Sequence, residues 1–110
     1  MKLYHGDASP FASRIRLAIY RKGLPVELAL RPREEPGLSE FLALSPIAKI
    51  PALQLSDGSL LPESLVILEY LEDKYPDPPL APPGAEARAR MRLISRLGDL
   101  YVFPALSRLS

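Results

Sequence analysis

The chain of 110 residues contains no cysteine and no tryptophan, and His5 is its one histidine. Without thiols the protein can form no disulfide, no thiolate metal site and no dithiol redox cycle of its own. A single histidine also excludes a centre in which several histidines hold one metal ion. We therefore predict that the protein binds no metal.

A strong charge imbalance and long apolar runs are missing as well. Fourteen basic and thirteen acidic residues leave a formal net charge of +1, which predicts no strong attraction to nucleic acid or to anionic lipid. No apolar stretch approaches the roughly 20 residues that span a bilayer. The first residues enter a strand pattern rather than a secretory signal. We expect a cytoplasmic protein with no membrane or nucleic-acid partner.

Proline, in contrast, is abundant, and most of the 13 prolines stand at the expected boundaries of short elements. The apolar patterns between them predict the order β-α-β-α-β-β-α, followed by a linker and a further helix. The expected strands are 2–5, 26–30, 51–55 and 60–61, and the expected helices are 10–22, 38–44 and 63–74. The helix at 63–74 carries apolar residues on more than one face, which predicts burial between two layers. Proline-rich residues 76–85 predict the linker, and residues 86–110 predict a helix with a kink at Pro104.

Ser9 and Pro10 mark the start of the helix at 10–22, with a serine N-cap before a proline in the first turn. The amides of that turn have no partners within the helix, and the helix dipole adds partial positive charge there. A sulfur or oxygen anion beside Ser9 would therefore be stabilised. An ordinary N-cap without a ligand leaves the same signature, and this alternative stays open.

Two further stretches carry comparable signals. Pro51 opens a strand after Ile50, a plausible cis bond whose turn would direct the Ile50 N–H and C=O outward to pair with an extended peptide. Where the fourth strand meets the next helix, the hydroxyl and amide of Ser64 would face an anion, and Glu63 could take an ammonium group. A zwitterionic amino-acid head matches that pair. The plainer alternatives are a proline that begins a strand and a serine that caps a helix.

Together these stretches resemble the N-terminal domain of the glutathione S-transferase family. Ser9-Pro10-Phe11-Ala12 resembles the Cys-Pro-Phe-Ala segment of omega-class members with serine in place of cysteine, and phi and theta members also use a serine near this point. Lys49-Ile50-Pro51 resembles the family's Lys-Val-Pro, and Glu63-Ser64 its Glu/Gln-Ser pair. The resemblance implies an α/β, thioredoxin-like domain at 1–75 with a mixed four-stranded sheet, and the first helix of an all-α domain at 86–110.

The resemblance also implies that glutathione is the ligand. Ser64 and Glu63 would hold its γ-glutamyl end, and the Ile50 backbone would pair with its cysteinyl unit while Pro51 keeps the turn cis. Lys49 would meet the glycyl carboxylate, and Phe11 would belong to the same binding set. Ser9 would donate a hydrogen bond to the sulfur and so favour the thiolate.

Other residues of these segments have alternative roles. Ser13, one turn deeper in the helix, is another hydroxyl that could meet the thiol, and Tyr4 is a rival donor because some classes use a tyrosine near the end of the first strand. We interpret His5 as structural. Arg14 and Arg16 are interpreted as a solvated helix face, with Arg14 as a possible support for the thiol loop.

The resemblance implies a glutathione transferase that activates the glutathione thiol for attack on an electrophilic small molecule, and it implies a homodimer. Family members run to about twice this length, so we expect either a longer protein or a partner that covers the last helix. A non-catalytic interaction protein is the alternative, because the linker resembles that of the RNA-polymerase-associated stringent starvation protein A. Disulfide reduction of the glutaredoxin kind is nearly excluded by the lack of cysteine.

Overall fold

The chain divides into two units, Met1–Pro78 and Pro79–Ser110, in a computed structural model that describes residues 1–45 and 47–109. The division falls inside the proline-rich segment 76–85, while the assignment of each unit as a functional domain stays a prediction. Pro46, part of the stretch before Pro51, lies outside the described residues, as does Ser110.

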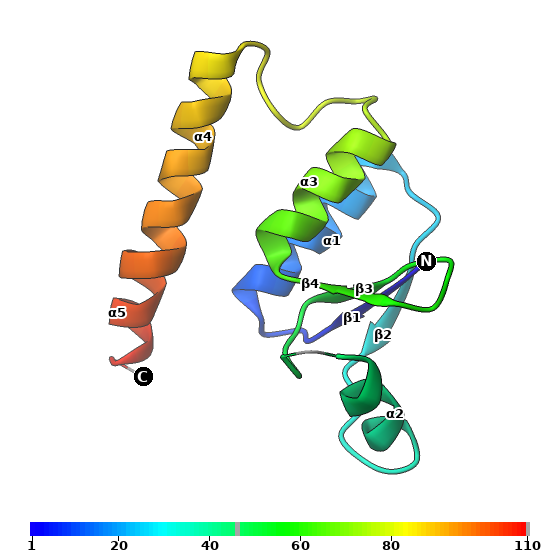
Figure 1. The fold of residues 1–110 in the computed structure, drawn as a ribbon. Coiled ribbons are helices and arrows are strands. Elements are labelled where there is room, and N and C mark those ends of the chain that lie inside the picture. Colours follow the sequence, from blue (N-terminus) through cyan, green and yellow to red (C-terminus); the bar gives the residue numbers. More distant parts are fainter. Residues whose placement is uncertain (46, 110) are drawn as a thin grey trace. The chain divides into compact units, whose positions relative to one another are not determined.

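The first unit alternates strands and helices in the predicted order (Figure 1). Its elements are β1 (Lys2–His5), α1 (Pro10–Lys22), β2 (Glu27–Leu30), α2 (Gly37–Leu44), β3 (Ala52–Gln54), β4 (Leu60–Pro62) and α3 (Ser64–Lys74). Strand β1 pairs in parallel with β2 and antiparallel with β3, which pairs antiparallel with β4, so the sheet order is β2-β1-β3-β4. This mixed four-stranded sheet confirms the predicted α/β fold class.

The core lies between the sheet and the helix pair α1 and α3, which run side by side (Figure 1). Successive strand residues point to opposite faces, so Leu3 enters this core while Tyr4 packs on the other face. There the Tyr4 ring meets Phe41 of α2 edge-on, with ring centroids 5.2 Å apart. The buried cluster that joins the sheet to α1 and α3 consists of Leu3, Ile15, Ile19, Leu53, Ile67 and Leu71.

Helix α3 buries one face only. Ile67 and Leu71 are fully buried, whereas Val66 is 46% exposed. The prediction that this helix is buried between two layers is therefore wrong for the chain as described. Helix α3 carries more apolar residues than its one packed face can bury.

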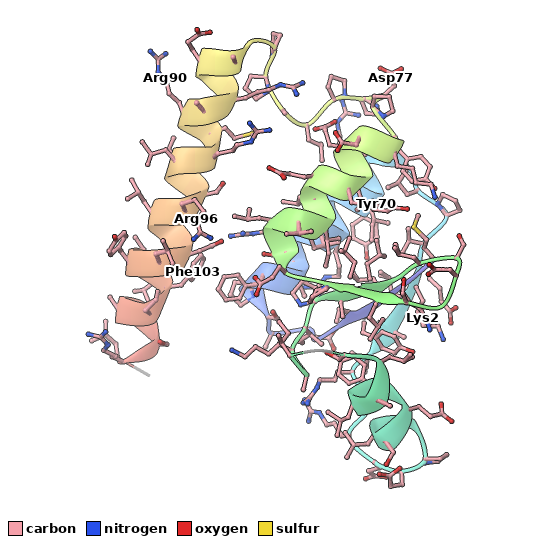
Figure 2. The ribbon with its side chains drawn as sticks, in the orientation of Figure 1. Lys2, Tyr70, Asp77, Arg90, Arg96 and Phe103 are labelled. Atoms are coloured by element: carbon pink, nitrogen blue, oxygen red, sulfur yellow. The ribbon has the colours of Figure 1, made fainter. Side chains whose placement is uncertain are left out.

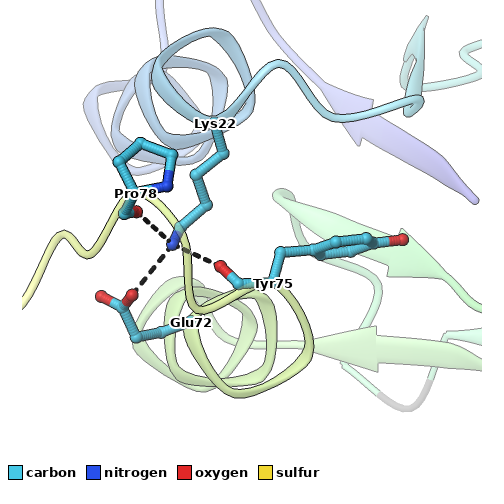
Figure 3. Close-up of polar contacts among 4 residues, drawn as sticks. All are labelled: Lys22, Glu72, Tyr75 and Pro78. Atoms are coloured by element: carbon cyan, nitrogen blue, oxygen red, sulfur yellow. Dashed lines mark hydrogen bonds and ion pairs between the residues drawn. The ribbon is translucent and has the colours of Figure 1, made fainter.

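A buried lysine ties the end of α1 to the end of α3 and to the linker (Figure 3). The Lys22 side chain is 0% exposed, and its Nζ lies 2.9 Å from Glu72 Oε1. The same ammonium donates to the carbonyl oxygens of Tyr75 at 2.6 Å and Pro78 at 2.8 Å. Because an ammonium has three protons and no acceptor, these contacts use its full hydrogen-bonding capacity.

The second unit is a helix with a wider turn near its end. Helix α4 (Ala85–Leu97) continues into the π-helical turn η1 (Gly98–Val102) and then into α5 (Phe103–Ser107). At that turn the Phe103 amide donates to the Gly98 carbonyl, five residues back. Pro104 follows this turn and has no N–H to offer the preceding turn, and the kink expected there stays a prediction. Among the described residues, no helix is both long and apolar enough to cross a membrane.

Candidate functional site

Ser9 caps the N-terminus of α1 as its sequence position predicts. Its Oγ accepts a hydrogen bond of 3.1 Å from the Ala12 amide, and Pro10 occupies the first turn. A hydroxyl has one proton and two acceptor sites. Within residues 1–45 and 47–109 the Ser9 proton meets no acceptor. The hydroxyl is therefore able to donate to an anion at this helix N-terminus.

The two rival donors are engaged elsewhere. Ser13 donates its single proton to the Ser9 carbonyl at 3.0 Å and accepts from Arg16 Nη2 at 2.8 Å. It therefore has no proton left for a ligand. The Tyr4 ring packs against Phe41, on the face of the sheet opposite α1. Both contacts favour Ser9 over these alternatives.

The segment after β1 lies directly against the loop that contains Ile50. The Ile50–Pro51 peptide bond is cis, which confirms the predicted isomer. A Cβ added at Gly6 would lie 2.8 Å from Ile50 Cδ1, so the Ile50 side chain would have to shift to make room for it. The Ile50 backbone N–H and C=O have no hydrogen-bond partner in the part of the chain that the structure describes. The segment that leads from β1 to Ser9 thus lies beside the Ile50 side chain.

The third motif joins the first through Arg14. Ser64 begins α3 with only 6% of its surface exposed, and its Oγ accepts a hydrogen bond of 3.2 Å from Arg14 Nη1. The same guanidinium lies 5.5 Å from the centroid of the Phe11 ring. Arg14 therefore links Phe11 on α1 to Ser64, a residue 50 positions later in the sequence. The alternative that Arg14 supports the thiol loop agrees with this geometry.

Glu63 adopts a backbone conformation that is unusual for a side-chain-bearing residue. Its φ of 73° lies in the region that favours glycine, and such a conformation costs of order 1–3 kcal/mol. Strain of this kind clusters at ligand-binding positions. The Glu63 side chain is exposed, so its carboxylate is accessible beside the buried Ser64.

Lys49 makes no contact with the predicted site residues of the other two motifs in the described part of the chain. Its side chain is exposed and has no partner among the residues described. It stands beside Ile50 in the loop before Pro51, whose own side chain is buried. The ligand contacts predicted for Lys49, and for Ser9, Phe11, Ile50, Pro51, Glu63 and Ser64, stay predictions.

Arg16 is the residue that the sequence pattern missed. The predicted solvated helix face at Arg14 and Arg16 is wrong, because both guanidinium groups are bonded and only partly exposed. Arg16 contacts the end of β1, the loop that follows and the first turns of α1. His5, predicted to be structural, is buried and contacts Arg16. The one local signal is the spacing of three residues between Ser13 and Arg16, which places them on the same helix face.

Residues 3–79 match the family model described as glutathione S-transferase, N-terminal domain. The chain belongs to the glutathione S-transferase family. It is 39% identical over 109 residues to a maleylacetoacetate isomerase of Pseudomonas aeruginosa, a match that covers 94% of the chain and 51% of that protein. It is also 35% identical over 94 residues to a stringent starvation protein A homolog of Coxiella burnetii, with coverage of 86% and 45%.

A solved glutathione S-transferase has the same architecture. The Methylobacterium radiotolerans enzyme, crystallised as a complex with glutathione sulfonate, superposes with a TM-score of 0.78 at 35% identity, covering 89% of this chain and 46% of that one. The chain thus spans about half the length of the relatives it matches. The matched region is the glutathione S-transferase N-terminal domain that contains all three motifs.

Proposed function

We propose that this glutathione S-transferase family member binds glutathione across its three motifs and ionises the thiol beside Ser9. One observation supports the proposal above all others. Gly6 packs on Ile50, and Arg14 bonds to Ser64, so segments far apart in the sequence meet around the N-terminus of α1. At that point the Ser9 hydroxyl retains a proton to donate.

Each part of the tripeptide has a chemically suitable group in this proposal. The γ-glutamyl carboxylate pairs with the Ser64 hydroxyl and amide, and its ammonium pairs with Glu63. The cysteinyl unit pairs with the free N–H and C=O of Ile50, as an added strand does. Lys49 neutralises the glycyl carboxylate.

The energy required for thiol activation is within reach of these groups. A free thiol has a pKa of about 8.5, and lowering it to about 6.5–7 requires roughly 2–3 kcal/mol of preferential thiolate stabilisation. A hydrogen bond to a charged group contributes about 1.5–3 kcal/mol, and a helix N-terminus typically adds about 0.3–1 kcal/mol. The Ser9 hydroxyl and the first turn of α1 supply both terms. Ser9 therefore donates and need not act as a nucleophile.

The thiolate would then attack an electrophilic carbon, and the similarity to maleylacetoacetate isomerase supports isomerisation of a maleyl-type double bond. The sulfur adds to one alkene carbon, and the electron pair moves onto the conjugated carbonyl. Rotation about the new single bond and expulsion of the thiolate give the trans alkene. Glutathione is regenerated, so no net oxidant or reductant is needed.

Calorimetric titration with glutathione tests the binding proposal. We expect binding by the unaltered chain, and about tenfold weaker binding by Ser64→Ala, which removes a hydroxyl that contacts a charged group. Ser56→Ala, in an exposed turn, is the matched control and should bind as the unaltered chain does. Glutathione at 100 times its dissociation constant should also add about 2.7 kcal/mol of stability. Absence of both heat and thermal stabilisation would refute the proposal.

A second function, non-catalytic interaction with a large complex, is supported by the similarity to the stringent starvation protein A homolog. Arg90 and Arg96 are exposed side chains of α4 (Figure 2), and these basic groups could dock on a protein partner. Co-purification with RNA polymerase, together with no response to glutathione, would favour this function. Cytoplasmic location and a homodimeric state also stay proposals, and sedimentation tests the latter.

A further inference from the structure

Arg16 joins four groups from three successive segments of the chain. Its Nη1 lies 2.9 Å from His5 Nδ1 and donates to the Gly6 carbonyl at 3.0 Å. Its Nη2 donates to Ser13 Oγ at 2.8 Å and, more weakly, to the Asp7 carbonyl at 3.4 Å. Because arginine only donates, His5 Nδ1 accepts. The end of β1, the loop after it and the start of α1 are thus bonded to one guanidinium group.

These contacts determine which way the loop amides point. In a trans peptide the C=O and the following N–H point in opposite directions. Since the carbonyls of Gly6 and Asp7 turn toward Arg16, the next two amides turn away from it. The Gly6 carbonyl also accepts from the Ser9 amide at 3.2 Å. The guanidinium therefore stabilises the loop conformation that delivers Ser9 to the helix N-terminus.

A second chain of contacts runs from Arg16 to Ser9 itself. Arg16 donates to Ser13 Oγ, and Ser13 Oγ donates to the Ser9 carbonyl at 3.0 Å. That carbonyl also accepts the Ser13 amide at 3.0 Å, the first bond of the helix. Arg16 thus limits rotation of the Ser9 residue without contacting its hydroxyl.

We propose that Arg16 is a positioning residue, which holds the Ser9 hydroxyl toward the bound thiol by the shape of its guanidinium group rather than by its charge. This inference rests on the proposed glutathione function and adds a residue to it. A planar fork with two terminal nitrogens can bond to four acceptors on different segments, whereas a lysine ammonium concentrates its donors on one atom. Lysine at this position would keep the charge and lose the fork.

Three substitutions separate the effect of the shape of the Arg16 guanidinium group from the effect of its charge. Arg16→Lys keeps the charge, Arg16→Gln removes it, and Arg21→Gln is the control because Arg21 is an exposed residue of the same helix. The first measurement is amide hydrogen exchange of the full chain without ligand. We expect about tenfold faster exchange at Ser9, Ala12 and Ser13 in both Arg16 variants, relative to amides in the middle of α1, and no change in Arg21→Gln.

The second measurement is the pH dependence of thiolate formation in bound glutathione, followed by its ultraviolet absorbance. Both Arg16 variants should move the midpoint upward to a similar extent, while glutathione affinity stays within about threefold, because the ligand's backbone and charged groups bind elsewhere. At pH 7 the thiolate fraction should fall by about fivefold to tenfold. A merely structural role would lower stability and leave this midpoint unchanged.

Ser13→Ala tests the route through the hydroxyl. If Arg16 acts through Ser13, the double variant Ser13→Ala/Arg16→Gln should shift the thiol midpoint no further than Arg16→Gln alone, because the two residues belong to one network. Additive shifts would exclude this route.

If Arg16→Lys matched the unaltered chain in both amide exchange and the thiol midpoint, the proposal would be overturned, since charge alone would then suffice. Unchanged exchange at Ser9, Ala12 and Ser13 in Arg16→Gln would overturn it as well, whether or not glutathione binds. Failure of the unaltered chain to bind glutathione would instead refute the proposed function and, with it, the role of Arg16 in thiol activation.

Discussion

Replacing Lys22 with methionine should destabilise the first unit more than any surface substitution. Lys22→Met keeps most of the side-chain volume and removes the ammonium that bonds to Glu72, Tyr75 and Pro78. Removing one partner of a buried ion pair costs about 3–5 kcal/mol, because the other charge is left uncompensated. Glu72 is 17% exposed, so water reaches its carboxylate in part. We therefore expect the lower end, about 3 kcal/mol.

Thermal and urea unfolding measure this loss. For a unit of this size, 1 kcal/mol corresponds to about 4–8 °C in Tm, so Lys22→Met should lower Tm by about 12 °C or more. Glu72→Gln keeps a carbonyl acceptor but leaves the buried Lys22 ammonium without its counter-charge, and should also cost about 3 kcal/mol. Arg21→Met, at the exposed neighbouring position, should stay within about 0.5 kcal/mol. A Lys22→Met variant as stable as Arg21→Met would refute this account of the contact.

Three further predictions concern two loops and the contact between Arg14 and Ser64. Ala48→Gly should raise stability by about 0.5–1 kcal/mol, because the φ of 54° at Ala48 strains an L-residue; a lower melting temperature would contradict this. Hydrogen bonds from the hydroxyl and amide of Ser59 hold the pKa of Asp57 below its ordinary value of 3.8. Asp57→Ala should therefore have a lower Tm than the unaltered chain at neutral pH, and this difference should disappear as pH falls below 3.8. A difference that persists in acid would show that the ionised carboxylate is not its cause. Arg14→Gln should weaken glutathione binding about threefold to tenfold in calorimetry, because Ser64 loses its charged donor; unchanged affinity would show that Arg14 does not support the site.

Local signals account for what the sequence predicted well. The serine-proline start of α1 and the glycine at its end specify the bounds Pro10–Lys22, because N-caps and left-handed C-caps act within a few residues. The turn around Gly58, with its φ of 89°, follows from the same kind of short-range chemistry. The three motifs were found because each marks the boundary between two elements.

Contacts between distant residues could not be predicted in this way. Arg14 reaches Ser64 across 50 positions and Lys22 reaches Pro78 across 56, so these contacts depend on how α1 and α3 pack. Arginines on a helix usually face solvent, which is why Arg16 was assigned to a solvated face. For helix α3 the sequence pattern predicted too much burial, because the helix carries more apolar residues than its buried face holds.

The central claim is that the Ser9 hydroxyl stabilises the thiolate of bound glutathione. Titrating the bound thiol in the unaltered chain and in Ser9→Ala tests it most directly. We predict a thiol pKa of about 6.5–7 in the unaltered chain and a return toward about 8.5 in Ser9→Ala, with glutathione affinity nearly unchanged. A bound thiol that already titrates near 8.5 in the unaltered chain, or a low value that survives the loss of the Ser9 hydroxyl, would contradict the claim.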